Sequence, residues 1–247
     1  MSSTSEKGHA KNLSSAHLLI NFILQFGTQY NPSNPLLLVT NLQALFTNAF
    51  AKQALVNSLI PPYVYAVDNR EILFAPLSKK ITKLFKVFKT SPGVTKAHEL
   101  DFMTIARKLK GYRKTTITPP NSSSSDTNAT QNHHSVSQMS YDQRINNFDI
   151  LIAFLISTLG YDPNETEFQI ATLQTEKNNL INATQAVGTT FIPLNKARSE
   201  RNDIMYLADD NLVETFNKAK DYLFTILDKN SAEYKAIARI KFSKIVS

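Results

Sequence analysis

Apolar side chains recur at helical spacing through most of this chain. Two stretches each place five of them on one helix face: Leu18, Leu19, Phe22, Ile23 and Phe26 in the first, and Phe148, Leu151, Ile152, Leu155 and Leu159 in the second. Two longer stretches, 34–74 and 164–206, have neither the alternation of a strand nor a cluster of loop residues. We therefore predict a short helix followed by a long one, twice over. A helix of about 40 residues is about 60 Å long.

Prolines interrupt both long stretches. Pro61 and Pro62 lie in the middle of the first stretch, and Pro193 lies within the second. Because proline lacks a backbone N–H and its ring clashes with the preceding turn, we expect these residues to kink or split each long helix.

Two further helices are predicted after each long one. The apolar faces of the third helices are Leu77, Ile81, Leu84, Phe85 and Phe88 in the first half of the chain, and Val213, Phe216, Ala219, Tyr222 and Leu223 in the second. The fourth helices each carry the tripeptide Ile-Ala-Arg, at Ile105 and at Ile237. No segment has the pattern of a strand, so the pattern predicts an all-α protein.

The two halves are similar in sequence as well as in pattern. The pentapeptide YNPSN begins at Tyr30 and YDPNE begins at Tyr161, 131 positions later. At the same separation Ile20 pairs with Leu151 and Leu24 pairs with Leu155, and further along the separation becomes 132, which indicates one inserted residue in the second copy. We interpret the chain as a tandem-duplicated helical bundle with long kinked helices, built from two similar four-helix repeats.

This interpretation divides the chain into four parts. Residues 1–13 are a polar tail that we expect to be disordered, and residues 14–114 are helical repeat 1, which has a basic end. Residues 115–139 are rich in Ser, Thr and Asn and are predicted to be a flexible linker. Residues 140–247 are helical repeat 2, and a capping-box pattern, Ser140 to Gln143, predicts where its first helix begins.

Several motifs carry a family resemblance. They are YNPSN, TNLQAL at Thr40–Leu45, APLSK at Ala75–Lys79 and SVSQMSYDQRINNFD at Ser135–Asp149. With these motifs the chain resembles a group of uncharacterised two-repeat helical proteins from Bacteroidota. The resemblance implies the duplicated helical fold and assigns no activity to any residue. The prolines of the long helices depart from the uninterrupted helices of that group.

The chain lacks the residue patterns of common catalytic and metal sites. It contains no Cys, which excludes disulfides and thiolate sites, and its five His residues form no metal-binding motif. The glycine motifs of nucleotide-binding loops and of serine hydrolases are also absent from the sequence. We therefore expect no enzymatic activity, no cofactor and no metal. The polar N-terminus lacks the apolar core of a signal peptide, and the apolar run Leu18–Phe26 is too short to span a bilayer. These observations favour a cytoplasmic protein.

Positive charge is concentrated at the end of the first repeat. Residues 76–114 contain 11 Lys or Arg and 2 acidic residues, whereas residues 141–247 contain 12 basic and 14 acidic residues. This segment is either a solvated lysine face or a binding surface for anions such as nucleic acid or an acidic membrane surface. The candidate anion-binding residues are Lys79, Lys80, Lys83, Lys86, Lys108, Lys110, Arg113 and Lys114.

A second surface is distinguished by its lack of charge. Between Asn12 and Val67 the only charged residue is Lys52. An uncharged polar face loses water at lower cost than a charged one, so this region is either a contact surface or a neutral solvated face. The candidate self-association residues are Asn41, Gln43, Thr47, Asn48, Gln53 and Asn57.

Two functional hypotheses follow from these surfaces. The first is a non-enzymatic structural, assembly or protein-interaction protein whose partner is a second copy or another protein. The alternative is a sequence-nonspecific nucleic-acid-binding protein that uses residues 79–114.

Overall fold

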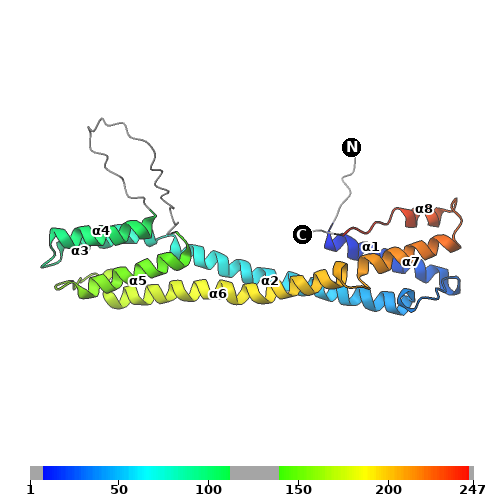
Figure 1. Cartoon of the computed structure of the whole chain (residues 1–247), viewed down its shortest axis with the longest axis horizontal. Coiled ribbons are helices and arrows are strands. Elements are labelled where there is room, and N and C mark those ends of the chain that lie inside the picture. Colours follow the sequence, from blue (N-terminus) through cyan, green and yellow to red (C-terminus); the bar gives the residue numbers. More distant parts are fainter. Residues whose placement is uncertain (1–7, 112–138, 245–247) are drawn as a thin grey trace, which may run out of the picture. The chain divides into compact units, whose positions relative to one another are not determined.

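The computed structural model describes residues 8–111 and 139–244, and all regular structure in these ranges is helical, with no strand (Figure 1). The α-helices are α1 (His9–Phe26), α2 (Val39–Phe74), α3 (Leu77–Thr90), α4 (Lys96–Lys110), α5 (Tyr141–Ser157), α6 (Ile170–Asn202), α7 (Leu212–Ile226) and α8 (Ala232–Ala238). Short 3-10 turns η1 (Gly27–Gln29), η2 (Pro35–Leu37) and η3 (Thr166–Phe168) lie between the first and long helices, and η4 (Asp203–Leu207) is a π-helical turn. The all-α prediction is confirmed.

The chain forms two compact units. Among the described residues, unit 1 contains 8–64 and 189–244, and unit 2 contains 65–111 and 139–188. Each unit therefore combines segments from both predicted repeats. The boundaries of the units lie within α2 and α6, because these two helices run from one unit into the other.

The core of unit 1 is built from α1, the first part of α2 and α7. Leu19, Ile23, Leu42 and Phe216 are almost fully buried there. The extended segment after α8 closes this core, since Ile240 is buried and the ring of Phe242 lies 5.7 Å from that of Phe216.

Within unit 1, α2 and α6 run antiparallel. Buried residues in α2 recur every seven positions at Leu42, Ala49 and Val56, a spacing typical of a coiled-coil seam. Val56 packs with Leu194 and Ala197 of α6. On either side of this contact, Lys52 pairs with Glu200 and the ring of Tyr63 lies 5.9 Å from that of Phe191. Residue numbers therefore fall along α6 as they rise along α2.

The core of unit 2 is built from α3, α4, α5 and the first part of α6. Phe88, Phe102, Phe148 and Leu173 are fully buried in it. The ring of Phe88 contacts those of Phe102, Phe154 and Tyr161 at centroid distances of 5.0, 5.6 and 6.1 Å. Stacked and tilted aromatic contacts of this kind add stability beyond the burial of apolar area.

The predicted N-terminal tail, residues 1–13, extends too far. Helix α1 begins at His9, and both Asn12 and Leu13 are buried. The cause is a set of contacts distant in sequence: the Asn12 amide donates to the carbonyl of Ser243 at 2.8 Å and accepts from its N–H at 3.1 Å. The sequence of residues 8–13 alone does not reveal these partners, so the start of α1 could not be predicted from it.

The predicted faces of the first helices also need correction. Leu18 is 48% exposed and Leu159 is 92% exposed, so neither belongs to the core. The predicted pair Leu24 and Leu155 is wrong, because Leu24 is 52% exposed whereas Leu155 is buried. Burial instead matches at a separation of 132, which pairs Leu19 with Leu151, Ile20 with Ile152 and Ile23 with Leu155.

The prolines do not split the long helices. Helix α2 continues through Pro61 and Pro62, and α6 continues through Pro193. Proline removes hydrogen bonds from these turns, yet both helices are supported by contacts on each side of the proline. The kink proposed for these sites stays a prediction. Residues 115–138 of the predicted linker lie outside the described residues.

Candidate interaction surfaces

The basic segment is divided by the fold into paired and unpaired lysines. On α3, Lys79, Lys83 and Lys86 are exposed and follow one another at the spacing of one helix face. They form no ion pair with any described residue. The apolar face of the same helix, Leu77, Ile81, Leu84 and Phe88, is buried in unit 2.

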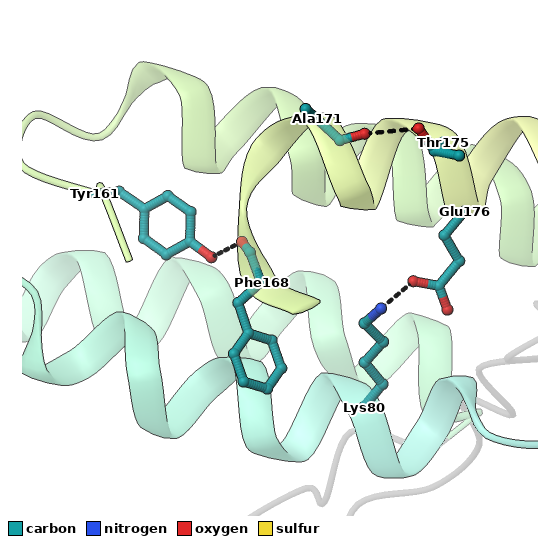
Figure 2. A network of polar contacts seen from close by, with 6 residues as sticks. All are labelled: Lys80, Tyr161, Phe168, Ala171, Thr175 and Glu176. Atoms are coloured by element: carbon teal, nitrogen blue, oxygen red, sulfur yellow. Dashed lines mark hydrogen bonds and ion pairs between the residues drawn. The ribbon is translucent and has the colours of Figure 1, made fainter. Parts of the chain in front are cut away.

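Lys80 differs from these neighbours because it forms an ion pair with Glu176 of α6, and the side chains are only 17% and 22% exposed (Figure 2). Figure 2 also places the nearby corner, where the hydroxyl of Tyr161 donates to the carbonyl of Phe168 at 2.7 Å. Lys80 therefore connects α3 to α6 and is not available to an external anion.

The remaining candidates for anion binding are dispersed. Lys108 is exposed on α4, whereas the Lys110 ammonium donates to the Thr82 hydroxyl at 2.6 Å. Burial lowers the pKa of Lys110 below the usual value for a lysine. Arg113 and Lys114 lie outside the described residues. Of the eight candidates, four are exposed cations without an ion-pair partner among the described residues.

The single charge of the charge-poor region is neutralised within unit 1. The ammonium of Lys52 lies 2.7 Å from a carboxylate oxygen of Glu200. The hydrogen bond and the charge of Lys52 lower the pKa of Glu200, which keeps this carboxylate ionised. The segment from Asn12 to Val64 therefore presents no unpaired Asp, Glu, Lys or Arg in unit 1.

Two hollows lie along this uncharged region, between α1 and α2. The first has a volume of about 500 Å³ and is lined by Ala10, Leu13, Ser14, His17, Phe46, Phe50, Gln53 and Asn57. The second, about 410 Å³, is lined by His17, Ile20, Asn21, Leu24, Gln43, Phe46 and Thr47. We refer to the two together as the α1–α2 groove. They share His17 and Phe46, whose rings stack at a centroid distance of 5.5 Å.

Four of the six predicted self-association residues line this groove. Gln43 and Thr47 border one hollow, and Gln53 and Asn57 border the other, where the Gln53 amide donates to the Asn57 carbonyl oxygen at 2.8 Å. Asn48 is exposed and lines neither hollow. Asn41 instead stabilises the corner before α2, because its amide donates to the carbonyl of Pro35 at 2.7 Å.

The sequence analysis did not include the aromatic side chains of this groove. Phe46 and Phe50 are one helical turn apart, with rings 6.0 Å from each other, and Phe50 is 57% exposed. The available signal was their spacing of four residues, which places both on one side of a helix, next to the core positions Leu42 and Ala49.

The described residues contain no cluster of three or more His, Asp or Glu side chains that is able to hold a metal ion. Among the same residues, no helix combines the length and the apolar character needed to cross a membrane.

Comparisons with known proteins give no match for this chain among family models, curated proteins or solved structures.

Proposed function

We propose that this chain is a non-enzymatic assembly or protein-interaction protein that associates with a second copy through the α1–α2 groove of unit 1. The observation that supports the proposal best is the combination of an uncharged surface with exposed aromatic groups. Phe50 is more than half exposed, the adjacent polar groups are amides, a hydroxyl and the imidazole of His17, and Lys52 is already paired. Contact cores of protein interfaces are depleted in charge and enriched in aromatic residues.

Desolvation should cost less free energy at this surface than at the corresponding surface of the second copy, so an interface is favoured here. Residues 12–67 hold one charged residue, while the aligned window of the second copy includes Glu165, Glu167 and Arg198, which form no ion pair with the described residues. Removing water from unpaired ionised groups is far more costly than removing it from amides that find new partners.

Light-scattering mass at high micromolar concentration tests this function. We expect a mass above that of one 27.7 kDa chain. The double variant Gln43→Glu with Thr47→Glu, both exposed in the groove, should return the mass to one chain because it places two carboxylates in the interface.

The chain offers a matched control for this variant. Gln174 and Asn178 are the residues 131 positions after Gln43 and Thr47, and both are exposed on α6. Gln174→Glu with Asn178→Glu should leave the mass unchanged. A wild-type mass of one chain at every concentration, or equal effects of the two double variants, would contradict the proposed interface.

We also propose that the fold arose by tandem duplication, as the sequence predicts. Equivalent corner contacts support this: Tyr30 donates to the carbonyl of Leu37 at 2.8 Å, and Tyr161 donates to that of Phe168 at 2.7 Å. The third helices bury matching positions at a separation of 135: Leu77 and Leu212, Ile81 and Phe216, Leu84 and Ala219, Phe88 and Leu223.

A π-helical turn, η4, lies close in sequence to the residue that we propose was inserted in the second copy. In the sequence comparison, the separation is 131 at Pro193 and 132 at Arg201, and the π-helical turn begins two residues later, at Asp203. The N–H of Ala208 bonds to the carbonyl of Asp203 at 2.9 Å, five residues back. A π-turn accommodates one extra residue in a helix without ending it.

In each unit, the corner tyrosine of one copy packs against an aromatic residue of the other copy. In unit 1, Tyr30 of the first copy packs edge-on against Tyr222 of the second, with centroids 5.2 Å apart. In unit 2, Tyr161 of the second copy packs against Phe88 of the first at 6.1 Å. This reciprocity supports a description of the chain as two fused, mutually dependent copies.

Cleavage between the copies tests their mutual dependence. A protease site inserted after Asn121 is cut in the full-length protein, and the product is compared with the uncut chain by gel filtration and circular dichroism. We expect the fragments to stay together and to retain helicity, because each unit contains segments of both. Separation into two folded fragments would contradict this description.

The exposed cations support anion binding as a second candidate function. If Lys79, Lys83, Lys86 and Lys108 contact phosphates, the logarithm of the binding constant for DNA should fall linearly with the logarithm of the salt concentration. Four contacts give a slope no steeper than about −4. Reversing these four charges to Glu should abolish binding, whereas Lys80→Gln should change it little because Lys80 is paired. Absence of binding at low salt would exclude this function.

A further inference from the structure

A separate groove lies in unit 2 between α3 and α4. It has a volume of about 590 Å³, and its lining includes Ile81, Thr82 and Phe85 from α3 and Leu100, Met103 and Lys110 from α4. Leu100 is 65% exposed and Met103 is 52% exposed. Large apolar side chains that adjoin one another at a surface are typical of binding sites. We call this feature the α3–α4 groove.

One end of the α3–α4 groove is positively charged. Arg107 and Lys110 both contribute to the lining, and no acidic residue does. Lys110 donates to the neutral hydroxyl of Thr82 and takes part in no ion pair with the described residues. Its lowered pKa has burial as its cause, which is the behaviour of an ammonium that has lost water without gaining a counter-charge. An external carboxylate would supply that charge.

The shape of the groove favours a helix as its occupant. On α4 the lining extends from Leu100 to Lys110, a length of about 15 Å along the helix axis, which accommodates anchors at positions i, i+4 and i+7. The half-exposed walls do not enclose a ligand as a small-molecule pocket does. Met103 adds an adaptable apolar contact of the kind used at helix-binding surfaces.

We propose that the α3–α4 groove binds an amphipathic helix of a partner protein, with apolar anchors on the groove floor and a carboxylate at Arg107 and Lys110. This deepens the proposed interaction function by specifying a partner chemistry. It uses unit 2 alone, so it stands or fails independently of self-association through the α1–α2 groove.

Fluorescence anisotropy on the full chain tests the proposal. The probe is a labelled peptide of about 18 residues with Leu at i, i+4, i+7 and i+11, two Glu beside the last Leu, and Ala and Gln elsewhere. A paired probe carries Lys in place of Glu. The Glu peptide should bind at least about tenfold more tightly than the Lys peptide, since charge-assisted hydrogen bonds form only with the former.

Three variants locate the binding. Lys110→Gln should weaken binding of the Glu peptide about tenfold, and Met103→Glu should abolish it. Lys83→Gln is the matched control, because Lys83 is an exposed α3 lysine that does not line the groove, and it should bind as wild type. Circular dichroism checks that each variant is folded.

Three results would overturn the proposal. The first is equal affinity for the Glu and Lys peptides, and the second is an equal effect of Lys83→Gln and Lys110→Gln. The third is binding of sodium dodecanoate, lost in Lys110→Gln, together with no binding of the peptide, which would assign the groove to a small anionic amphiphile. The wild-type mass and the Gln43 and Thr47 variant report separately on self-association.

Discussion

The two units contain the same corner in different surroundings. In each, a buried tyrosine hydroxyl donates to a carbonyl seven residues later, Tyr30 to Leu37 and Tyr161 to Phe168. Around this shared contact the units differ. A Cβ at Gly160 in unit 2 would overlap the carbonyl oxygen of Pro92, whereas a Cβ at Gly27 in unit 1 would meet nothing within 4 Å.

The tyrosine hydrogen bond is therefore common to both corners, whereas the contact at the glycine occurs in unit 2 alone. The hydrogen bond fixes the chain between the first helix and the long helix, and it is present twice. The backbone contact at Gly160 brings the end of α5 against the turn between α3 and α4, which is specific to unit 2. Changes to the shared contact should therefore have similar effects in both units, and changes to the specific contacts should not.

The largest expected effect comes from the aromatic cluster on which the unit 2 corner rests. Phe88→Ala should lower the free energy of unfolding by about 3–5 kcal/mol, because Phe88 is fully buried among three aromatic rings. Leu223 of unit 1, the residue 135 positions later, is also fully buried, and Leu223→Ala should cost about 2–4 kcal/mol because a smaller cavity is left. Urea denaturation followed by circular dichroism measures both.

Phe50→Ala is the control for these substitutions. Phe50 is 57% exposed, so its removal should change the free energy of unfolding by less than about 1 kcal/mol. A larger loss for Leu223→Ala than for Phe88→Ala would contradict the assignment of the main aromatic cluster to unit 2.

The glycines of the two corners provide the sharpest contrast. Gly160 has φ of 86°, and Gly27 has φ of 52° with ψ of −124°, so alanine is strained at either position by about 1–3 kcal/mol. At Gly160 the new methyl group also overlaps a backbone carbonyl that cannot move alone. Gly160→Ala should therefore lower the thermal midpoint clearly more than Gly27→Ala. Equal shifts would show that the contact with Pro92 does not constrain unit 2.

Local periodicity was enough to predict the class of fold and the order of the helices. Both the all-α class and the capping of α5 by Ser140, which accepts from the Gln143 N–H at 3.2 Å, were predicted from nearby residues. Contacts between distant residues were not predictable in this way. Glu176 is 96 residues from Lys80, and Ser243 is 231 residues from Asn12.

Surface predictions were limited for the same reason. Composition identified the charge-poor region, and four of its six polar candidates do line the α1–α2 groove. Composition did not separate Lys80, which is paired, from Lys79 and Lys83, which are exposed, because the acid that pairs with Lys80 belongs to α6. Pairing of charges is a property of tertiary packing, whereas charge density is a property of the segment.

The shared hydroxyl should contribute similarly in both units. Tyr30→Phe and Tyr161→Phe should each cost about 1–2 kcal/mol, because each leaves a buried carbonyl without its donor. Denaturant midpoints at pH 8 measure this loss. A difference of more than about 1 kcal/mol between the two variants would contradict the equivalence of the corners.

Alkaline pH should reduce the effect of Tyr30→Phe. Burial raises the pKa of Tyr30 to about 12, above its ordinary value of 10.0. The neutral phenol therefore contributes fully below pH 10 and loses its contribution as the pH rises from 10 to about 12. Only the wild type carries this loss, so the difference in stability between wild type and Tyr30→Phe should shrink between pH 8 and pH 11.

The smallest expected effect concerns the start of α1 in unit 1. Nδ1 of His9 lies 2.8 Å from the hydroxyl of Tyr206, which also accepts from the Asn12 amide at 3.2 Å. Since that hydroxyl accepts from Asn12, its own proton is free to bond to an unprotonated Nδ1, and a neutral imidazole is favoured. Burial, followed by the nearby charge of Arg201, lowers the pKa of His9 below 6.5.

A depressed histidine pKa contributes stability above its unfolded value and loses it as the pH falls through the folded one. Wild-type stability should therefore decline from pH 7 to pH 5 more than that of His9→Gln, which has no titrating group at this position. Tyr206→Phe should also reduce the decline in stability from pH 7 to pH 5, because this variant lacks the hydrogen bond to neutral His9 at every pH. At the start of α5 in unit 2 a polar contact is instead made by Arg144, which donates to the carbonyl of Phe74 at 3.0 Å and stays charged over this pH range. Parallel pH curves for wild type and His9→Gln would show that the imidazole does not contribute to this difference between the units.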